Sequence, residues 1–115
     1  MMKKPIEIVL LKQAEDFIDE IEELVRKKFL LSMRKTKSRI FGEWFTKMTD
    51  ANDLFEFKVD YNGKFYRLFS FWDSRGETET LIVCSHGLIK KTNKTPKSEI
   101  AKALDIKNKY FKGLI

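Results

Sequence analysis

The chain has 115 residues, of which 43% are hydrophobic and 13% aromatic. This length predicts one domain with a single core, and the apolar content excludes an intrinsically disordered chain. The only cysteine, Cys84, cannot form an internal disulfide, and the only histidine adds little metal-binding capacity. We therefore expect neither a metal nor another cofactor.

The net charge of +6 is concentrated near the C-terminus. Residues 1–57 contain 11 lysines and arginines and 11 acidic residues, which cancel. Residues 88–112 contain eight lysines against Glu99 and Asp105, so this last quarter accounts for the whole excess. Such confined positive charge is typical of a surface that binds a polyanion, and it is equally typical of a solubilising helix face.

The first predicted elements are a strand over residues 6–11 and helical structure from Leu11 to Ser32. The apolar run IEIVLL is too short for a membrane span and lacks the cleavage site of a signal peptide, so we expect a cytoplasmic protein. Apolar residues then recur with a period near 3.6, and a break near Asp19 and Glu20 predicts two helices. Their apolar stripe comprises Phe17, Ile21, Leu24, Val25 and Leu31.

A β-hairpin is predicted over residues 54–72, after a stretch, residues 36–53, that fits either a short helix or a packed loop. Two runs of alternating polarity, LFEFKVDY and KFYRLFSFW, flank Asn62-Gly63, which is the strongest short-range signal of a two-residue hairpin turn. This turn fixes the register and places Lys58 opposite Arg67. The stretch before the hairpin closes on the turn residues Asp50, Asn52 and Asp53.

The Lys58–Arg67 pair is the first candidate functional feature. Two cations directly opposite each other destabilise a sheet unless an anion compensates them. Glu56, diagonal to Arg67, supplies part of that compensation, and a bound phosphate would supply the rest. Alternatively, both cations extend into solvent. Arg67 is the stronger candidate because its guanidinium fork matches phosphate oxygens.

Residues 81–89, LIVCSHGLI, read as a central strand that leads into a final helix. Gly87 marks a bend in the strand, and His86 fits either a structural histidine or an acid–base group beside the lysines that follow. Thr95 fits the helix N-cap and Pro96 the first helical position. The stripe expected to pack on the sheet comprises Ile100, Ala103, Leu104, Lys107 and Phe111.

The segment HGLIKKTNKTP, residues 86–96, carries the second candidate feature. Its lysines precede a helix N-terminus, which attracts anions by itself. If these lysines act together with Arg67, all of them must converge on one concave surface. The residues that we assign to RNA binding are Lys90, Thr92, Lys94, Thr95 and Lys97.

Three segments in order, LFEFKV, NGKFYRLFSFWD and LIVCSHGLIKKTNKTPKSEIAKA, resemble the phage-derived Gp49-like branch of the RelE/HigB toxins. The resemblance is close over residues 54–105 and covers residues 1–53 in outline. It implies a single α+β domain over residues 1–115, in which N-terminal helices pack on a small, mostly antiparallel sheet and a helix follows. It also implies a type II toxin that cleaves mRNA on the ribosome, and an antitoxin, often a helix-turn-helix protein, encoded beside it.

Position by position, the resemblance implies functional roles for Arg67, for His86 and for the cluster that begins at Lys90. Leu88 stands where family members often have phenylalanine, and the chain lacks the terminal histidine-containing segment of other HigB toxins. The resemblance therefore leaves the general acid and base open.

In a metal-independent cleavage, the 2′-hydroxyl of RNA attacks the adjacent phosphorus and the 5′-oxygen leaves. Clustered cations stabilise the phosphorane. We assign Arg67 to its oxyanion, Lys90 and Lys91 to the phosphates, and Lys58 to proton acceptance. His86 and Tyr110 are further acid–base candidates. Aromatic residues suited either to base stacking or to core packing are Trp44, Tyr61, Phe65, Tyr66 and Trp72.

Three other readings stay open from the sequence. A ParE-like toxin would poison gyrase and leave DNA breaks. A non-catalytic module would only grip nucleic acid, with steep salt dependence. An inactive relic would only bind its partner. Fold alone does not choose between them.

Overall fold

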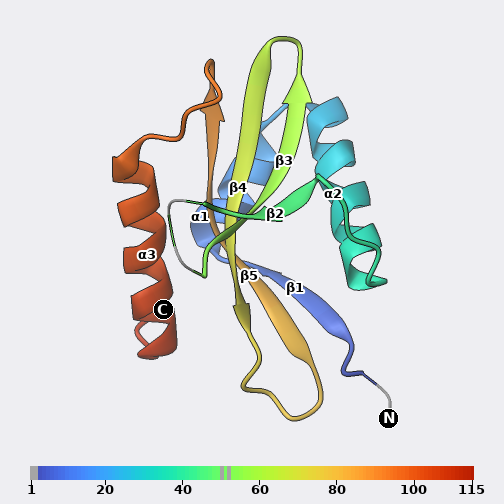
Figure 1. Ribbon diagram of the computed structural model, residues 1–115, viewed down its shortest axis with the longest axis vertical. Coiled ribbons are helices and arrows are strands. Elements are labelled where there is room, and N and C mark those ends of the chain that lie inside the picture. Colours follow the sequence, from blue (N-terminus) through green and yellow to red (C-terminus); the bar gives the residue numbers. More distant parts are fainter. Residues whose placement is uncertain (1–2, 50, 52) are drawn as a thin grey trace.

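The computed structural model describes residues 3–49, 51 and 53–115, and these residues form an α+β fold, as predicted. The elements are β1 (Ile6–Leu10), α1 (Lys12–Glu20), α2 (Glu23–Lys37), β2 (Phe45–Lys47), β3 (Phe55–Tyr61), β4 (Lys64–Asp73), β5 (Thr80–Lys90) and α3 (Lys97–Phe111). The strands form one sheet in the order β1-β5-β4-β3-β2 (Figure 1). β1 runs parallel to β5, and the other described pairs are antiparallel.

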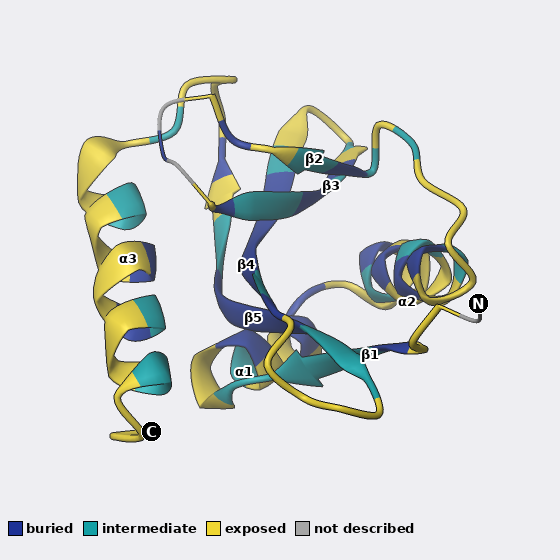
Figure 2. Ribbon diagram, turned by 60° about the horizontal axis from the view of Figure 1, so that its bottom comes forward, coloured by how far each residue is buried: buried dark blue, intermediate teal, exposed yellow. Residues whose placement is uncertain are grey.

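Each face of the sheet has its own apolar core (Figure 2). On one face, Phe57 and Leu68 pack with Val25 and Phe29 of α2, and residues of α1 join this cluster. On the other face, α3 packs through Ala103 against a second cluster of buried residues. The sheet is therefore buried on both faces, which explains the nearly continuous apolar sequence of β5.

The hairpin of β3 and β4 has the predicted register. Asn62 and Gly63 have positive φ angles of 53° and 78°, which a two-residue turn of this kind requires at both central positions. Tyr61 pairs with Lys64, and Lys58 pairs with Arg67. The two cations therefore lie side by side on the face of the sheet that α3 partly covers.

A β-bulge between β4 and β5 changes which face the end of β5 presents. Leu68 pairs with Gly87 and Ser70 with Cys84, so two residues of β5 oppose one residue of β4. Side chains normally alternate along a strand, and the extra residue shifts this alternation. Beyond the bulge, Lys90 pairs with Phe65 and thus shares a face with Arg67.

The N-terminal helices divide where the sequence predicted a break. α1 ends at Glu20 and α2 begins at Glu23, and the Arg26 side chain donates hydrogen bonds to the carbonyls of residues 18, 19 and 21. The predicted stripe is wrong at Leu24 and Leu31, which are exposed. The buried side of α2 instead comprises Val25, Phe29, Met33 and Thr36.

Residues 36–53 contain a strand that the sequence did not predict. β2 pairs antiparallel with β3, and its Phe45 packs on Phe57 with ring centroids 4.5 Å apart. The predicted turn residues Asp50 and Asn52 lie outside the described residues. Asp53 has a positive φ of 65°, as a tight turn requires.

The last helix begins later than predicted. α3 starts at Lys97 with Pro96 at the N-cap, and Thr95 does not cap it. On the side facing the sheet, Ala103 and Ile106 are buried, whereas Leu104 is exposed. Among the described residues, no helix is long and apolar enough to cross a membrane.

Candidate functional site

Arg67 is buried in β4 although it carries a charge. Only 3% of the residue is exposed, and its Nη1 donates to Asp60 Oδ1 at 2.6 Å and to the Tyr66 carbonyl at 3.0 Å. The guanidinium also lies over the Phe65 ring. Its Nε is buried with no hydrogen-bond partner in the described chain. A buried donor without a partner is costly, so this atom is suited to a ligand.

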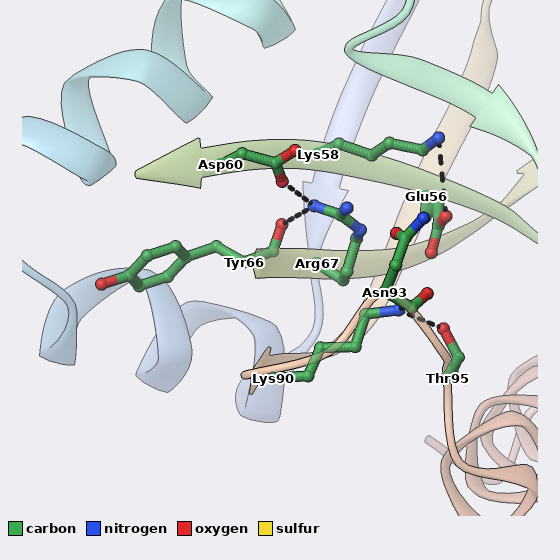
Figure 3. Close-up of polar contacts among 8 residues, drawn as sticks. All are labelled: Glu56, Lys58, Asp60, Tyr66, Arg67, Lys90, Asn93 and Thr95. Atoms are coloured by element: carbon green, nitrogen blue, oxygen red, sulfur yellow. Dashed lines mark hydrogen bonds and ion pairs between the residues drawn. The ribbon is translucent and has the colours of Figure 1, made fainter. Parts of the chain in front are cut away.

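Lys90 lies at the end of β5 and is 8% exposed. Its ammonium donates to the Asn93 carbonyl at 3.0 Å and to Thr95 Oγ1 at 2.6 Å (Figure 3). These two bonds hold the turn between β5 and α3. The hydroxyl of Thr95 thus serves as an acceptor for Lys90, and it makes no capping hydrogen bond to α3.

Burial lowers the pKa of the Lys90 ammonium. The neighbouring charges of Arg67 and Lys58 lower it further, while Glu56 and Asp60 act in the opposite direction. An ammonium group has three N–H donors, so one remains after the two bonds to the turn. Lys90 can therefore offer a proton to a ligand more readily than an exposed lysine does.

Glu56 brings a carboxylate to the same place. Its side chain is 12% exposed, and Oε1 lies 3.9 Å from Lys58 Nζ. Oε2 is buried and has no hydrogen-bond partner among the described residues. An ionised carboxylate only accepts hydrogen bonds, so this oxygen is available to take a proton.

These side chains, which Figure 3 shows, line two adjoining pockets. The first, of about 220 Å³, is lined by Glu56, Lys90 and nine other described residues including Lys94 and Thr95. The second, of about 590 Å³, is lined by Glu43, Trp44, Asp60 and Arg67. Both are also lined by Thr46, Lys58 and Asn93. Arg67 and Lys90 thus converge on one cleft, which we define as these two pockets together.

Several assigned residues lie outside the cleft. Lys91, Thr92 and Lys97 are exposed, and none of them lines either pocket in the described part of the chain. Lys90 is the last residue of β5, and the side chains of Lys91 and Thr92, which follow it, are exposed outside the two pockets. Of the predicted RNA-binding residues, the structure brings Lys90, Lys94 and Thr95 to the cleft.

His86 lies in another pocket, between α1 and α3. The imidazole stacks on Phe69 at 4.7 Å between ring centroids, and its Nε2 is 3.5 Å from Glu99 Oε2. Burial lowers the pKa of His86, the charge of Lys102 lowers it further, and Glu99 partly offsets both effects. Because His86 packs between Phe69 and Glu99 and lines neither pocket of the cleft, the structure does not support its assignment to a common site with Arg67.

Tyr110 is also remote from the cleft. Its hydroxyl donates to Asp73 Oδ2 at 2.7 Å, and burial raises its pKa. Of the aromatic residues considered for base stacking, Trp44 lines the second pocket, whereas Tyr66 is fully buried in the core. Trp72 packs edge-on against Phe45 and Phe55.

Sequence reasoning missed the roles of Asn93 and Glu43. Asn93 lines both pockets, although nothing in its position between Thr92 and Lys94 singled it out. Glu43 belongs to the ambiguous stretch before β2, so its neighbours could not be predicted. The sequence does point to Glu56, because the hairpin register places its carboxylate diagonal to Arg67. That position predicts charge compensation, and it does not by itself predict a proton acceptor.

Comparison with known proteins identifies the family. Residues 16–108 match the family model described as "Phage derived protein Gp49-like (DUF891)". No curated protein and no solved structure matches the chain. The matched range begins within α1, ends within α3 and contains every side chain that lines the cleft. Since it covers most of the chain, this chain is a member of the phage-derived Gp49-like family.

Proposed function

We propose that the protein is a toxin that cleaves mRNA on the ribosome, with the cleft as its active site. The observation that carries this proposal is the buried guanidinium of Arg67. Its Nε has no hydrogen-bond partner in residues 3–49, 51 and 53–115, and it adjoins a pocket with Lys58, Lys90 and Lys94. Buried cations with unused donors are suited to the extra negative charge of a phosphorane. The resemblance to RelE/HigB toxins supports the same reaction.

The proposed chemistry uses three side chains. Glu56 Oε2 takes the proton of the RNA 2′-hydroxyl, whose oxygen then attacks the adjacent phosphorus. Arg67 donates hydrogen bonds to the phosphorane oxygens. The bond from phosphorus to the 5′-oxygen breaks, and Lys90 gives that oxygen a proton. The products are a 2′,3′-cyclic phosphate and a free 5′-hydroxyl.

Lys58 acquires a different role from the one that we expected. The Lys58 ammonium lies beside Glu56 and lines both pockets. A cation in this position holds the carboxylate in place and contacts the phosphate, and Glu56 is the better proton acceptor because its oxygen carries no proton. The ribosome contributes by orienting the message, which a few side chains in a shallow cleft do not achieve alone.

The test is growth inhibition on induced expression, combined with 5′-end mapping of transcripts. We expect the natural chain to stop growth and to produce new 5′-hydroxyl ends. Arg67→Ala, Arg67→Lys and Glu56→Gln should each reduce cleavage by at least about 100-fold, because each removes a group that acts in the transition state. Arg34→Ala is the matched control, since Arg34 is an exposed arginine on α2.

Thermal denaturation of each purified variant separates loss of chemistry from loss of fold. Uncut transcripts from the natural chain, with growth still arrested, would overturn the nuclease proposal. The next partner to test would then be gyrase, and accumulated DNA breaks would identify it. Full cleavage by a folded Arg67→Ala variant would remove Arg67 from the mechanism.

A further inference from the structure

The two pockets of the cleft differ in chemistry. The first combines four lysines and threonine hydroxyls with one carboxylate, that of Glu56, and this excess of cations suits phosphate oxygens. The second adds two carboxylates, Glu43 and Asp60, and the indole of Trp44. In the second pocket these two carboxylates face only two cations, Lys58 and Arg67, so its charge favours phosphate less than the charge of the first pocket does.

Only one of these carboxylates, that of Asp60, has a structural role as a hydrogen-bond acceptor for Arg67. Nη1 of Arg67 is already bound by Asp60 Oδ1 and by the Tyr66 carbonyl. Glu43 is exposed at the rim of the second pocket, on the segment that leads into β2. The Glu43 carboxylate is therefore placed to accept hydrogen bonds from a ligand that reaches into this pocket.

Trp44 provides a fixed apolar wall beside Glu43. Its Nε1 donates to Thr36 Oγ1 at 3.2 Å, and the Lys35 ammonium lies 4.9 Å from the ring centroid. The ring also packs on Gly42, where an added Cβ would lie 2.2 Å from a ring atom. Contacts on several sides hold the indole in one orientation, so the wall is preorganised.

We propose that the second pocket binds a nucleobase, and that Glu43 selects bases with an exocyclic amino group. This inference rests on the proposed function, because it takes the phosphate of the same nucleotide to lie between Arg67 and Lys90. The volume of about 590 Å³ lies within the range of pockets that hold small molecules. Thr46, Lys58 and Asn93 line both pockets, so one nucleotide can reach both.

The discrimination follows from hydrogen-bond donors. Cytosine and adenine present an amino group, and guanine presents an amino group beside a ring N–H, so each can donate to a carboxylate. Uracil has two carbonyl oxygens on either side of its single N–H, and these oxygens face the carboxylate unfavourably. The second pocket therefore disfavours uridine.

Binding of nucleoside 3′-monophosphates tests the inference without any cleavage. Cytidine and uridine 3′-monophosphates are a matched pair, since they differ little in size. Titrations of the ¹⁵N-labelled full chain would follow the Trp44 indole N–H and the Asn93 side-chain amide. We expect cytidine 3′-monophosphate to bind about fivefold more tightly than the uridine compound, which corresponds to one hydrogen bond. Inorganic phosphate should leave the Trp44 signal in place.

Glu43→Gln should bring the ratio of the two affinities close to one, because an amide can donate to uracil as well as accept from cytosine. Glu77→Gln, in the exposed β4–β5 loop, should keep the fivefold ratio. Equal binding of the two nucleotides would overturn the base preference. If inorganic phosphate still bound and transcripts were still cut, the proposed function would stand, and only the base preference would be wrong. If neither nucleotide bound, the base pocket itself would be wrong.

Discussion

At the scale of single residues, three charged side chains show how a fully paired group differs from one that keeps an unpaired polar atom. Asp73 is saturated: it accepts hydrogen bonds from the Arg75 side chain and backbone and from the Tyr110 hydroxyl. Arg67 Nε, Glu56 Oε2 and, outside the cleft, His86 Nε2 are buried with no hydrogen-bond partner among the residues that the structure describes. Since folding alone gains nothing from leaving such atoms unpaired, the two that lie in the cleft support our proposal that it binds a ligand.

Asp73 gives a prediction about acid stability. The Arg75 guanidinium, followed by the Tyr110 hydroxyl, lowers the pKa of Asp73 to about 2 from its ordinary value of 3.8, against the opposing effect of burial. Because the pKa is lower in the folded chain, the carboxylate stabilises the fold fully above about pH 4 and loses this effect as pH falls towards 2. Asp73→Asn should lower the free energy of unfolding at pH 7 by about 2 kcal/mol.

Urea denaturation of both chains between pH 7 and pH 2 measures this effect. The difference in stability between the natural chain and Asp73→Asn should shrink across the acid limb. Asp105→Asn is the control, because Asp105 makes an exposed ion pair with Lys109 on α3, and such pairs contribute little. A difference that stayed constant from pH 7 to pH 2 would show that the ionisation of Asp73 is not the cause.

At the scale of elements, the site depends on one hairpin and one bulge. The hairpin turn sets Lys58 beside Arg67, and the bulge in β5 directs Lys90 to the same face. Gly87, which pairs with Leu68 at the bulge, lets α1 approach β5 closely. A Cβ at this position would lie 2.1 Å from a ring atom of Phe17. The placement of Lys90 is thus coupled to the packing of an N-terminal helix.

Gly87→Ala should therefore destabilise the fold by about 1–3 kcal/mol, as overpacking does elsewhere. Phe17→Ala should make the loss caused by Gly87→Ala much smaller in the double variant, because it removes Cγ, Cδ1 and Cδ2 of Phe17, the atoms that the new methyl group meets. Chemical denaturation of the two single variants and the double variant gives the coupling energy between the positions. Strictly additive losses would show that the approach of Phe17 is not the reason for glycine here.

The elements divide into those that the sequence could predict and those that it could not. Asn62-Gly63 determines a local turn, so the Lys58–Arg67 pair was predictable to the residue. β2 is three residues long and is held by pairing with β3, a contact that no local pattern encodes. The bulge in β5 could not be predicted either, because LIVCSHGLI is mostly apolar and its pattern does not show which face each residue takes. His86 is close to the lysines along the chain, but its packing against Phe69 and Glu99 separates it from the cleft, and no local pattern encodes those contacts.

At the scale of the whole molecule, the excess positive charge is spread over a wider surface than the cleft. Of the eight lysines in residues 88–112, Lys90 and Lys94 line the first pocket. Lys107 and Lys109 lie near Asp53 and Asp105 instead. α3 has 15 residues and spans about 22 Å, so Lys112 at its far end is well beyond one Debye length, about 8 Å, from the cleft. Total charge therefore overstates the part that can act on a bound phosphate.

This separation yields a comparison between two lysines. For a single-stranded RNA with 2′-deoxy substitutions that prevent cleavage, the logarithm of affinity should fall linearly with the logarithm of salt concentration. Lys94→Ala should reduce that slope by about 0.7, the value for one lost phosphate contact on a single strand. Lys112→Ala should leave the slope unchanged, although both variants lose one positive charge. Equal changes in slope would mean that RNA follows the outer face of α3, and that the cleft between Arg67 and Lys90 is not where the strand is held.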